Sequence, residues 1–556
     1  MILRRLYLYL VSAAGLGLLA AGLVLLGNTV LLFVFNDRYA QDSRTQLAVY
    51  TAMTLVALPV WAIHFWFARR LGLRNPAERA SAIRRLYIYW ACLGGALGAL
   101  WALAVAAANL LRPLIDTCAP TVYSCFPNPN WLVISQAAWT ALVFIAIWAF
   151  HFRIAARDRA AVGEIGASAT LRRWYMYVVL LVSLLLMLSG ATSLIEVGWL
   201  RAWHISLFDY RLMSDPSGML LAGAVVWSFH AIAIARDHIS EDRHSTLRAL
   251  QGFIVVAISI AVALVAASQI LYYGLARAIG VAHPGGIGND ILGALAAPGS
   301  QVLVYGVAWF LMRRRLARDA RAQEGDRQAG LRRLYTNLVA LVSLGAGAIG
   351  AGGLLWTLAE QVEAPIIGVK ASDWKDPVSL WLTLLVVGAA VWLAHWRPAP
   401  WAEDRQSLSR RLYVWAALLS SVLVILGAGV GMLTALLRQV FSAHPTLADS
   451  ANLDFGHYLA VIVVALVVGA YHRQVLRADA AARPPKVAAA AAAVADAAPQ
   501  PARELRPAAS ANSHSRRYVL AITDATEDDV HQALANLPPH ASYKLTPAEK
   551  DVVDDR

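Results

Sequence analysis

The 556-residue chain has little charge. Asp, Glu, Lys and Arg together make up 15% of it, whereas 59% of its residues are hydrophobic. Soluble domains usually carry about 25% charged residues, so this composition excludes a chain of ordinary soluble domains and indicates a membrane protein. Lys and Arg exceed Asp and Glu by 48 − 35 = 13, which in a membrane protein is typical of loops on the cytoplasmic side. No basic and aromatic cluster indicates a nucleic-acid partner.

Motifs for catalysis are missing as well. The sequence contains no HExxH, GxSxG, Walker or CxxC pattern, each of which would indicate a defined chemistry. The segment Gly285-Gly286-Ile287-Gly288 lacks the flanking strand and helix of a nucleotide-binding loop. We therefore expect no enzymatic activity, no catalytic residue, no cofactor and no metal site.

Cysteine is scarce, with three residues in the chain. Cys92 lies in an apolar run, whereas Cys118 and Cys125 share one short proline-containing loop. If that loop faces an oxidising compartment, we expect a disulfide between them, and two free thiols are the alternative.

The sequence does contain a short motif that returns about every 80 residues and each time opens a long apolar run. Its five clear copies are Arg4-Arg5-Leu6-Tyr7, Arg84-Arg85-Leu86-Tyr87, Arg172-Arg173-Trp174-Tyr175, Arg332-Arg333-Leu334-Tyr335 and Arg410-Arg411-Leu412-Tyr413. A degraded copy is expected at Leu247-Arg248-Ala249-Leu250.

A second motif, Trp-x-x-His, ends a later apolar run in the same repeats. Its copies pair Trp61 with His64, Trp148 with His151, Trp227 with His230, and Trp392 with His395. The fourth repeat has Trp309 and Met312, and the sixth has Gly469 and His472.

Each repeat thus holds two runs of the roughly 20 apolar residues that a membrane-spanning helix needs. We expect an all-α integral membrane protein with about 12 transmembrane helices, arranged as six hairpin repeats. Their limits are 1–80, 81–168, 169–245, 246–329, 330–407 and 408–479.

The loops between repeats are richer in Lys and Arg than the loops within them. The positive-inside rule then places both termini in the cytoplasm, so that all hairpins are parallel in the cell inner membrane. Residues 480–515, rich in Ala and Pro, are expected to form a linker. Residues 516–556 show a strand-like alternation and a helix signal, which predicts a small β-α-β-like cytoplasmic segment that contacts a protein partner.

The two motifs are expected at one membrane depth, where Trp and His three residues apart share a helix face. The structural interpretation is a clasp in which a Tyr hydroxyl or backbone carbonyl accepts the imidazole proton and Arg binds lipid phosphate. The alternatives are a ring of histidines that handles an ion or ligand and haem held by paired histidines.

With these motifs, roughly residues 1–477 resemble the domain-of-unknown-function family DUF5671. The resemblance implies a multi-span bacterial inner-membrane protein of unassigned activity and transfers no catalytic residue. Charged residues such as Asp116, Glu196 and Glu360 fall near helix ends rather than at span centres, where transport residues are usual. Our first expectation is therefore a non-enzymatic scaffold or complex subunit that contacts the lipid bilayer. A channel or transporter along the repeat axis and a haem-binding redox subunit are the alternatives.

Overall fold

The computed structural model describes residues 2–116, 129–164, 166–205, 213–237, 242, 245–284, 291–322, 326–396, 405, 407–441 and 454–481. Within these residues all regular structure is helical. The helices are α1 (Ile2–Val34), α2 (Arg44–Arg74), α3 (Pro76–Arg79), α4 (Ala82–Ile115), α5 (Trp131–Val162), α6 (Ala167–Ala202), α7 (Ser214–Asp237), α9 (Thr246–Ile279), α10 (Ile291–Ala322), α11 (Asp326–Ile367), α12 (Lys375–His395), α14 (Leu408–Phe441) and α15 (Asp454–Ala481), with one short 3-10 helix at Gln41–Ser43.

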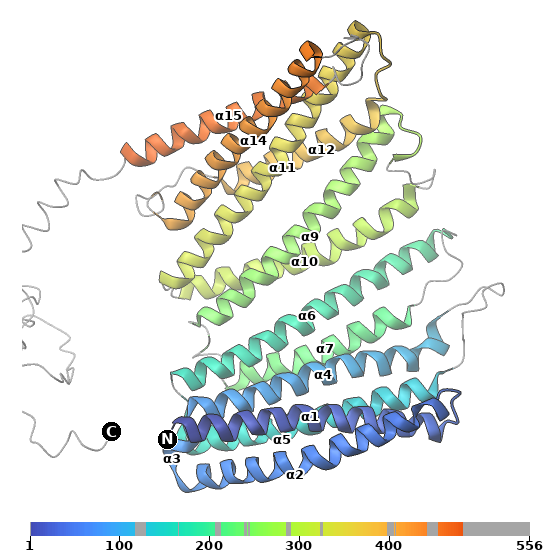
Figure 1. The fold of residues 1–556 in the computed structure, drawn as a ribbon, viewed down its shortest axis with the longest axis vertical. Coiled ribbons are helices and arrows are strands. Elements are labelled where there is room, and N and C mark those ends of the chain that lie inside the picture. The colour runs from blue at the N-terminus through green and yellow to red at the C-terminus, as the bar shows by residue number, and fades with distance from the viewer. Residues whose placement is uncertain are drawn as a thin grey trace, which may run out of the picture. The chain divides into compact units, whose positions relative to one another are not determined.

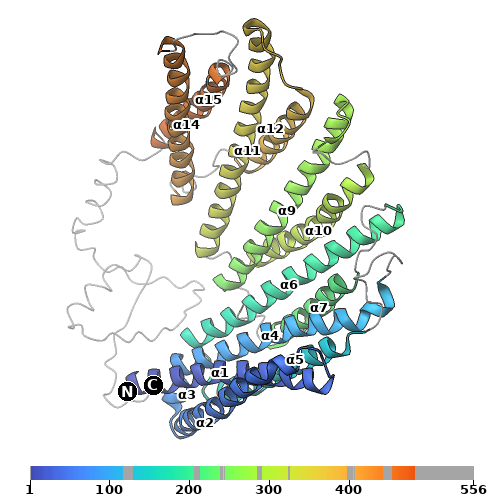
Figure 2. The ribbon, with the colours of Figure 1, turned by 45° about the vertical axis from the view of Figure 1, so that its right-hand side comes forward.

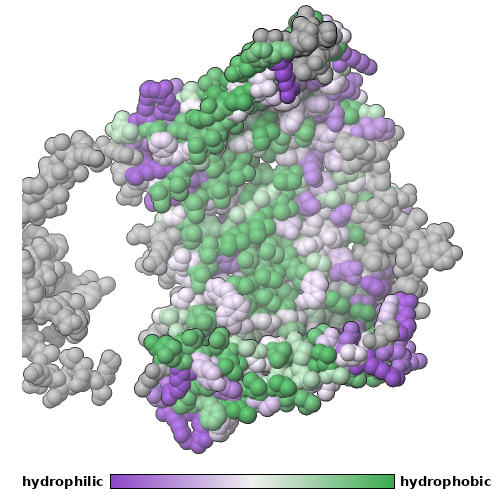
Figure 3. Space-filling view, viewed as in Figure 1, coloured by the Kyte–Doolittle hydropathy of each residue, from purple (hydrophilic) through white to green (hydrophobic). Residues whose placement is uncertain are grey.

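Twelve of these helices are long and apolar enough to cross a membrane. The longest, α11, has 42 residues, which at 1.5 Å per residue is about 63 Å and exceeds the roughly 30 Å hydrocarbon thickness. Figure 3 shows hydrophobic residues over the middle of the helices and hydrophilic ones gathered toward their ends. The predicted all-helical class and its twelve spans are confirmed.

Local sequence sets several helix boundaries. Pro76 occupies the first turn of α3, and the Asn75 side chain accepts a hydrogen bond from the backbone N–H of Ala77. Asn130 caps α5 in the same way through Val133. Gly280 ends α9 with φ of 85°, a left-handed conformation that costs glycine least.

The long helices pack as consecutive pairs: α1–α2, α4–α5, α6–α7, α9–α10, α11–α12 and α14–α15. We call the earlier member of each pair the leading helix and the later one the trailing helix. The start of each leading helix lies beside the end of its trailing helix. The hydrogen bonds of Tyr7 with His64 and of Tyr87 with His151 show this arrangement in the first two pairs. The two helices of a pair are therefore antiparallel, and we call this end of each pair the motif end.

The pairs follow one another in a row. Each leading helix packs against the next leading helix, from α1 and α4 through to α11 and α14. Each trailing helix also packs on the preceding leading helix: α5 on α1, α7 on α4, α10 on α6, α12 on α9 and α15 on α11. Figures 1 and 2 show the pairs in this order, with α1–α2 and α14–α15 at opposite ends of the row.

The contacts between pairs depend on small residues in places. A Cβ atom added to Gly218 of α7 would lie 2.3 Å from the carbonyl oxygen of Ala104 in α4, so only glycine allows this approach. The largest buried cluster lies in the first three pairs and is rich in aromatic residues, including Phe65, Tyr87 and Tyr175. A separate cluster joins the fifth and sixth pairs.

The chain divides into one unit of residues 1–484 and another of residues 485–556. The second unit lies outside the described residues. The predicted linker beyond residue 481 and the predicted segment 516–556 therefore stay predictions.

Candidate functional site

Within a pair, the motif tyrosine meets the motif histidine. The Tyr hydroxyl lies close to Nε2 of the imidazole in four pairs. The distances are 3.2 Å for Tyr7 and His64, 3.1 Å for Tyr87 and His151, 2.8 Å for Tyr175 and His230, and 2.9 Å for Tyr413 and His472. In the fifth pair the rings of Tyr335 and His395 make an edge contact at 6.3 Å between centroids.

The motif tryptophan reaches out of its own pair. Trp61 Nε1 donates to the hydroxyl of Tyr87 at 2.9 Å, which belongs to the next pair. The indoles of Trp148 and Trp392 donate in the same way, at 2.8 Å, to the motif tyrosines of the third and sixth pairs. Trp309 lies beside Tyr335 of the fifth pair. The junctions of the first with the second, the second with the third, and the fifth with the sixth pair thus each contain a hydrogen-bonded Trp-Tyr-His triad, to which one pair contributes Trp and the next contributes Tyr and His.

These hydrogen bonds determine which atoms of the Tyr and His side chains donate and which accept a proton. Because the indole N–H can only donate, the Tyr oxygen accepts from it and its O–H donates to His Nε2. Nδ1 of each imidazole lies 2.7–2.9 Å from the backbone carbonyl one turn earlier in the helix, and so carries the proton. Both ring nitrogens of His64, His151, His230 and His472 are therefore engaged in the neutral form. Such an imidazole has no nitrogen left for a metal ion or haem iron.

The fourth repeat departs from the pattern. Arg248 pairs with Asp319, which lies two turns beyond Met312, just as Arg84 pairs with Asp158 two turns beyond His151. The fourth copy of the motif is therefore Arg248-Ala249-Leu250-Gln251. It begins one residue later than the predicted copy, Leu247-Arg248-Ala249-Leu250.

That correction puts Gln251 where the other copies have Tyr, opposite Met312 where they have His. Gln251 is buried, and its Oε1 atom has no hydrogen-bond partner among the described residues. The junction between the third and fourth pairs consequently lacks the triad. Its core is a small cluster that includes Leu184, Leu188 and Val255.

The two ends of the row also depart from the pattern. Tyr7 is exposed, and among the described residues no indole donates to its hydroxyl. Gly469 stands in the Trp position of the sixth pair, which is the last pair among the described residues. Trp is thus replaced in the last of the described repeats, whereas the third repeat keeps Trp227 although Gln251 stands in the Tyr position of the next pair.

Most of the motif arginines bind carboxylates that lie in the last turns of a trailing helix or in the connector after it. Arg4 and Arg5 donate to Glu78 at 2.9 and 2.8 Å. In the second, third and sixth pairs Arg84 binds Asp158, Arg85 lies near Glu164, Arg172 and Arg173 bind Asp242, and Arg410 binds Asp479. Arg172 also lies 2.9 Å from Glu164 of the second pair, so this ion pair joins two pairs.

The expectation that these arginines bind lipid phosphate is wrong for three of them. Arg84, Arg85 and Arg172 are almost completely buried, and their ion pairs lie inside the protein. Arg84 also donates to the hydroxyl of Tyr9 in the preceding pair at 3.1 Å. Arg332 and Arg411 are exposed at the starts of α11 and α14.

Glu78 belongs to the short helix α3, outside the spans. Burial alone would raise the pKa of this carboxyl, but the hydrogen bonds and positive charges of Arg5 and Arg4 outweigh burial and lower the pKa. The carboxylate is therefore ionised at neutral pH and holds the start of α1 against the connector that follows α2.

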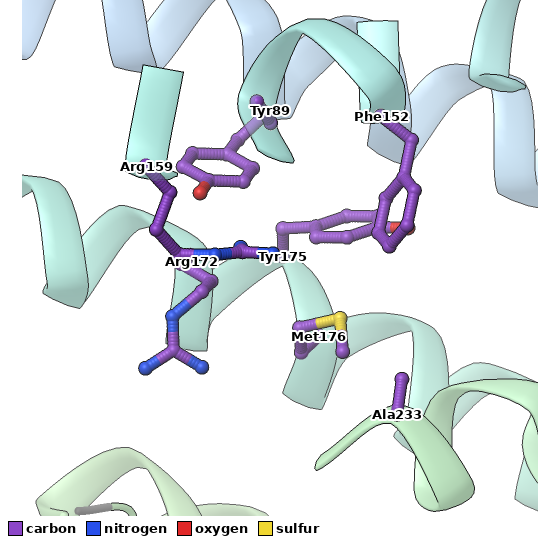
Figure 4. Close-up of a pocket in the computed structure, with 8 residues that line it drawn as sticks. Tyr89, Phe152, Arg159, Arg172, Tyr175, Met176 and Ala233 are labelled. Atoms are coloured by element: carbon purple, nitrogen blue, oxygen red, sulfur yellow. The ribbon is translucent and has the colours of Figure 1, made fainter. Parts of the chain in front are cut away.

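A small cavity lies beside this layer, between α4, α5, α6 and α7 (Figure 4). Tyr89, Arg159, Arg172, Tyr175 and Met176 line it, and its volume is about 20 Å³. This is room for one water molecule and far below the roughly 300–1,000 Å³ of small-molecule sites. Across the described ranges, no three His, Cys, Asp or Glu side chains are placed to hold a metal ion.

Of the predicted cysteine pair, both Cys118 and Cys125 lie outside the described residues, so their disulfide stays a prediction. Cys92 is buried in α4 with a free thiol.

Twelve apolar helices, with a polar layer whose side chains bind one another, define a multi-pass helical membrane protein. The chain belongs to the family described as Domain of unknown function (DUF5671), whose model matches residues 5–126, 96–204 and 333–470. The resemblance seen in the motifs is therefore confirmed. The unmatched residues 205–332 include the triad-free junction of Gln251 and Met312. No curated protein and no solved structure matches the chain.

Proposed function

We propose that this protein is a non-enzymatic membrane scaffold or complex subunit, built from six parallel hairpin repeats that the Trp-Tyr-His triads hold together. One observation carries the proposal: the indole of each triad comes from one pair and the phenol and imidazole come from the next. A side-chain layer of this kind uses its polar atoms on itself, which suits a rigid framework.

We place the motif end in the cytoplasm of a bacterial cell, with both termini on that side of the inner membrane. The support is the distribution of Lys and Arg, which are concentrated between the repeats. Residues 516–556 would then be available to a protein partner next to the membrane.

The alternatives have less support. A channel or transporter needs a lumen, whereas the cavity at the layer has room for about one water molecule. A haem subunit needs a free imidazole nitrogen, whereas in four pairs both nitrogens of the motif histidine are hydrogen-bonded.

The test is purification of the full chain from its native membrane in mild detergent, after brief chemical cross-linking. A scaffold should retain a partner protein in a fixed molar ratio, and its absorption spectrum should show protein bands alone. A Soret band would support the redox alternative. Solute flux in liposomes that contain only this protein, without any retained partner, would support the channel.

A further inference from the structure

One face of each leading helix from α1 to α11 carries the next pair, whereas on α14 no described pair covers this face. Two residues after the motif Tyr, this face presents Tyr9, Tyr89 and Tyr177 in the first three leading helices, and they are 5, 2 and 3% exposed. Tyr9 accepts from an arginine of the next pair, and Tyr89 stacks on the next motif Tyr at 5.9 Å between centroids. The corresponding residue of α14 is Trp415, which is 58% exposed.

The same face also contacts the next pair nearer the opposite end of the helices. Asn28 of α1 donates to Thr140 of α5, Tyr272 of α9 donates to Asp376 of α12, and Trp356 of α11 stacks on His457 of α15. Each contact joins a leading helix to the trailing helix of the next pair.

Six turns along α14, the corresponding residue is Thr434. Its side chain is exposed, and its hydroxyl donates to the carbonyl of Val430 within α14. The face that other leading helices use for the next pair is therefore uncovered along α14, from Trp415 to Thr434.

The first pair shows the complementary gap. Trailing helices α5 and α7 pack on the preceding leading helix, and in one shared repeat position they carry Val143 and Ala222, which are 7 and 4% exposed. The corresponding residue in α2, Val56, is 60% exposed. One turn earlier, Ala52 is exposed as well, whereas its counterparts Thr383 and Ala460 are buried. Among the described residues, the leading helix of another pair does not cover this face of α2.

We propose that a second copy of this chain docks head to tail, with its α1–α2 pair on α14, in the place that a seventh pair would take. The proposal rests on the repeat arrangement proposed above. The support is continuity with the interface that joins successive pairs within the chain. On α14 the leading-helix side of this interface is uncovered, and on α2 the trailing-helix side is uncovered. An interface of this type is heterologous, so copies form a closed ring or an open row.

The register follows from the inner junctions. In α7, Gly218 lies against Ala104 and Ala108 of α4. The residues in the same repeat positions are Ala52 in α2 and Val430 and Thr434 in α14. Ala52 of one copy should therefore lie beside Val430 of its neighbour. Because Gly469 replaces the motif Trp, this junction has no triad, as the junction of the third and fourth pairs has none.

Cysteine cross-linking in native membranes tests the register. Ala52→Cys and Val430→Cys are placed in two differently tagged copies, in which Cys92, Cys118 and Cys125 have been replaced by alanine or serine. Oxidation should give a product that carries both tags, at twice the mass of the 60.1 kDa chain. The matched control replaces Val430→Cys with Val265→Cys, which is equally exposed on α9 but outside any junction face; it should give no such product.

Two results would overturn the proposal. A product from Val430→Cys alone would indicate a two-fold contact of α14 with itself, and the absence of any product would mean that lipid covers both faces. A control chain carries both Asn28→Cys and Thr140→Cys, at neighbouring positions in α1 and α5. It distinguishes failure of the contact between copies from failure of the repeat arrangement within one chain. If the pairs pack as proposed, these two cysteines should form a disulfide within the chain, whether or not copies cross-link to one another.

Discussion

Replacement of Tyr175 by Phe removes one oxygen that serves two hydrogen bonds. Tyr175 is fully buried; it accepts from Trp148 at 2.8 Å and donates to His230 at 2.8 Å. Loss of the hydroxyl leaves an indole donor and an imidazole acceptor unpaired. An unpaired buried group costs about 1–3 kcal/mol, but hydrogen bonds between membrane helices average only about 0.6 kcal/mol and reach about 1.7. For two bonds we expect a loss of about 1–3 kcal/mol in the free energy of unfolding.

The matched control is Tyr7→Phe, the same change in the first copy of the motif. Tyr7 is exposed and has only His64 as a hydrogen-bonded partner on its hydroxyl, so we expect a loss of about 0.5 kcal/mol or less. The assay is reversible unfolding in mixed micelles, followed by tryptophan fluorescence. Equal losses in the two variants would refute the reasoning, because they would show that neither burial nor the indole donor matters.

Three further predictions concern other parts of the chain. Gln251→Tyr combined with Met312→His should restore the missing triad and raise the unfolding free energy by about 1 kcal/mol, whereas Gln251→Tyr alone should give no gain; a gain from the single variant would contradict the triad logic. Arg5 and Arg4 lower the pKa of Glu78, so the stability that the Glu78 carboxylate contributes is fully present above its unfolded pKa of about 4.3 and is lost as the pH falls through the folded pKa. Glu78→Gln should therefore lower the denaturant midpoint of unfolding at pH 7 and make that midpoint fall less steeply in acid. Parallel curves of midpoint against pH for the two proteins would argue against this role. In a variant with Cys92→Ala, Cys118 and Cys125 should react with maleimide only after reduction, and labelling of the unreduced variant would exclude the disulfide.

Much of the fold could be predicted from the sequence because membrane spans are a matter of length and composition. Runs of about 20 apolar residues have few alternatives in a bilayer, and twelve were found where the composition placed them. The tertiary arrangement could not be predicted in the same way, since apolar periodicity does not say which helix lies beside which.

The site shows where prediction stopped. The sequence placed Trp148 and His151 on one helix face, but it could not say that the two side chains serve different pairs. A signal for this was present, because the last repeat keeps His472 and replaces only its Trp, at Gly469. A Trp needed by the following pair would be dispensable there.

The partners of the arginines were also missed. Asp158, Asp319 and Asp479 each follow the His or Met position by two helical turns, a repeated acidic position that the motif comparison overlooked. A basic motif at the membrane surface favours lipid phosphate as the partner. The structure instead brings each of these carboxylates to an arginine of its own pair, because the two ends of an antiparallel pair meet at one depth.

The most direct test of the central claim is a double-mutant cycle between Trp148→Phe and Tyr175→Phe, measured by unfolding in micelles. If the indole and the phenol join neighbouring pairs, the two changes should be non-additive by about 0.5–1.5 kcal/mol. A parallel cycle between Trp148→Phe and Tyr7→Phe should be additive, because Tyr7 lies at the end of the row and shares no hydrogen bond with Trp148. Additivity in both cycles would contradict the account, since the triads would then contribute nothing to holding the pairs together.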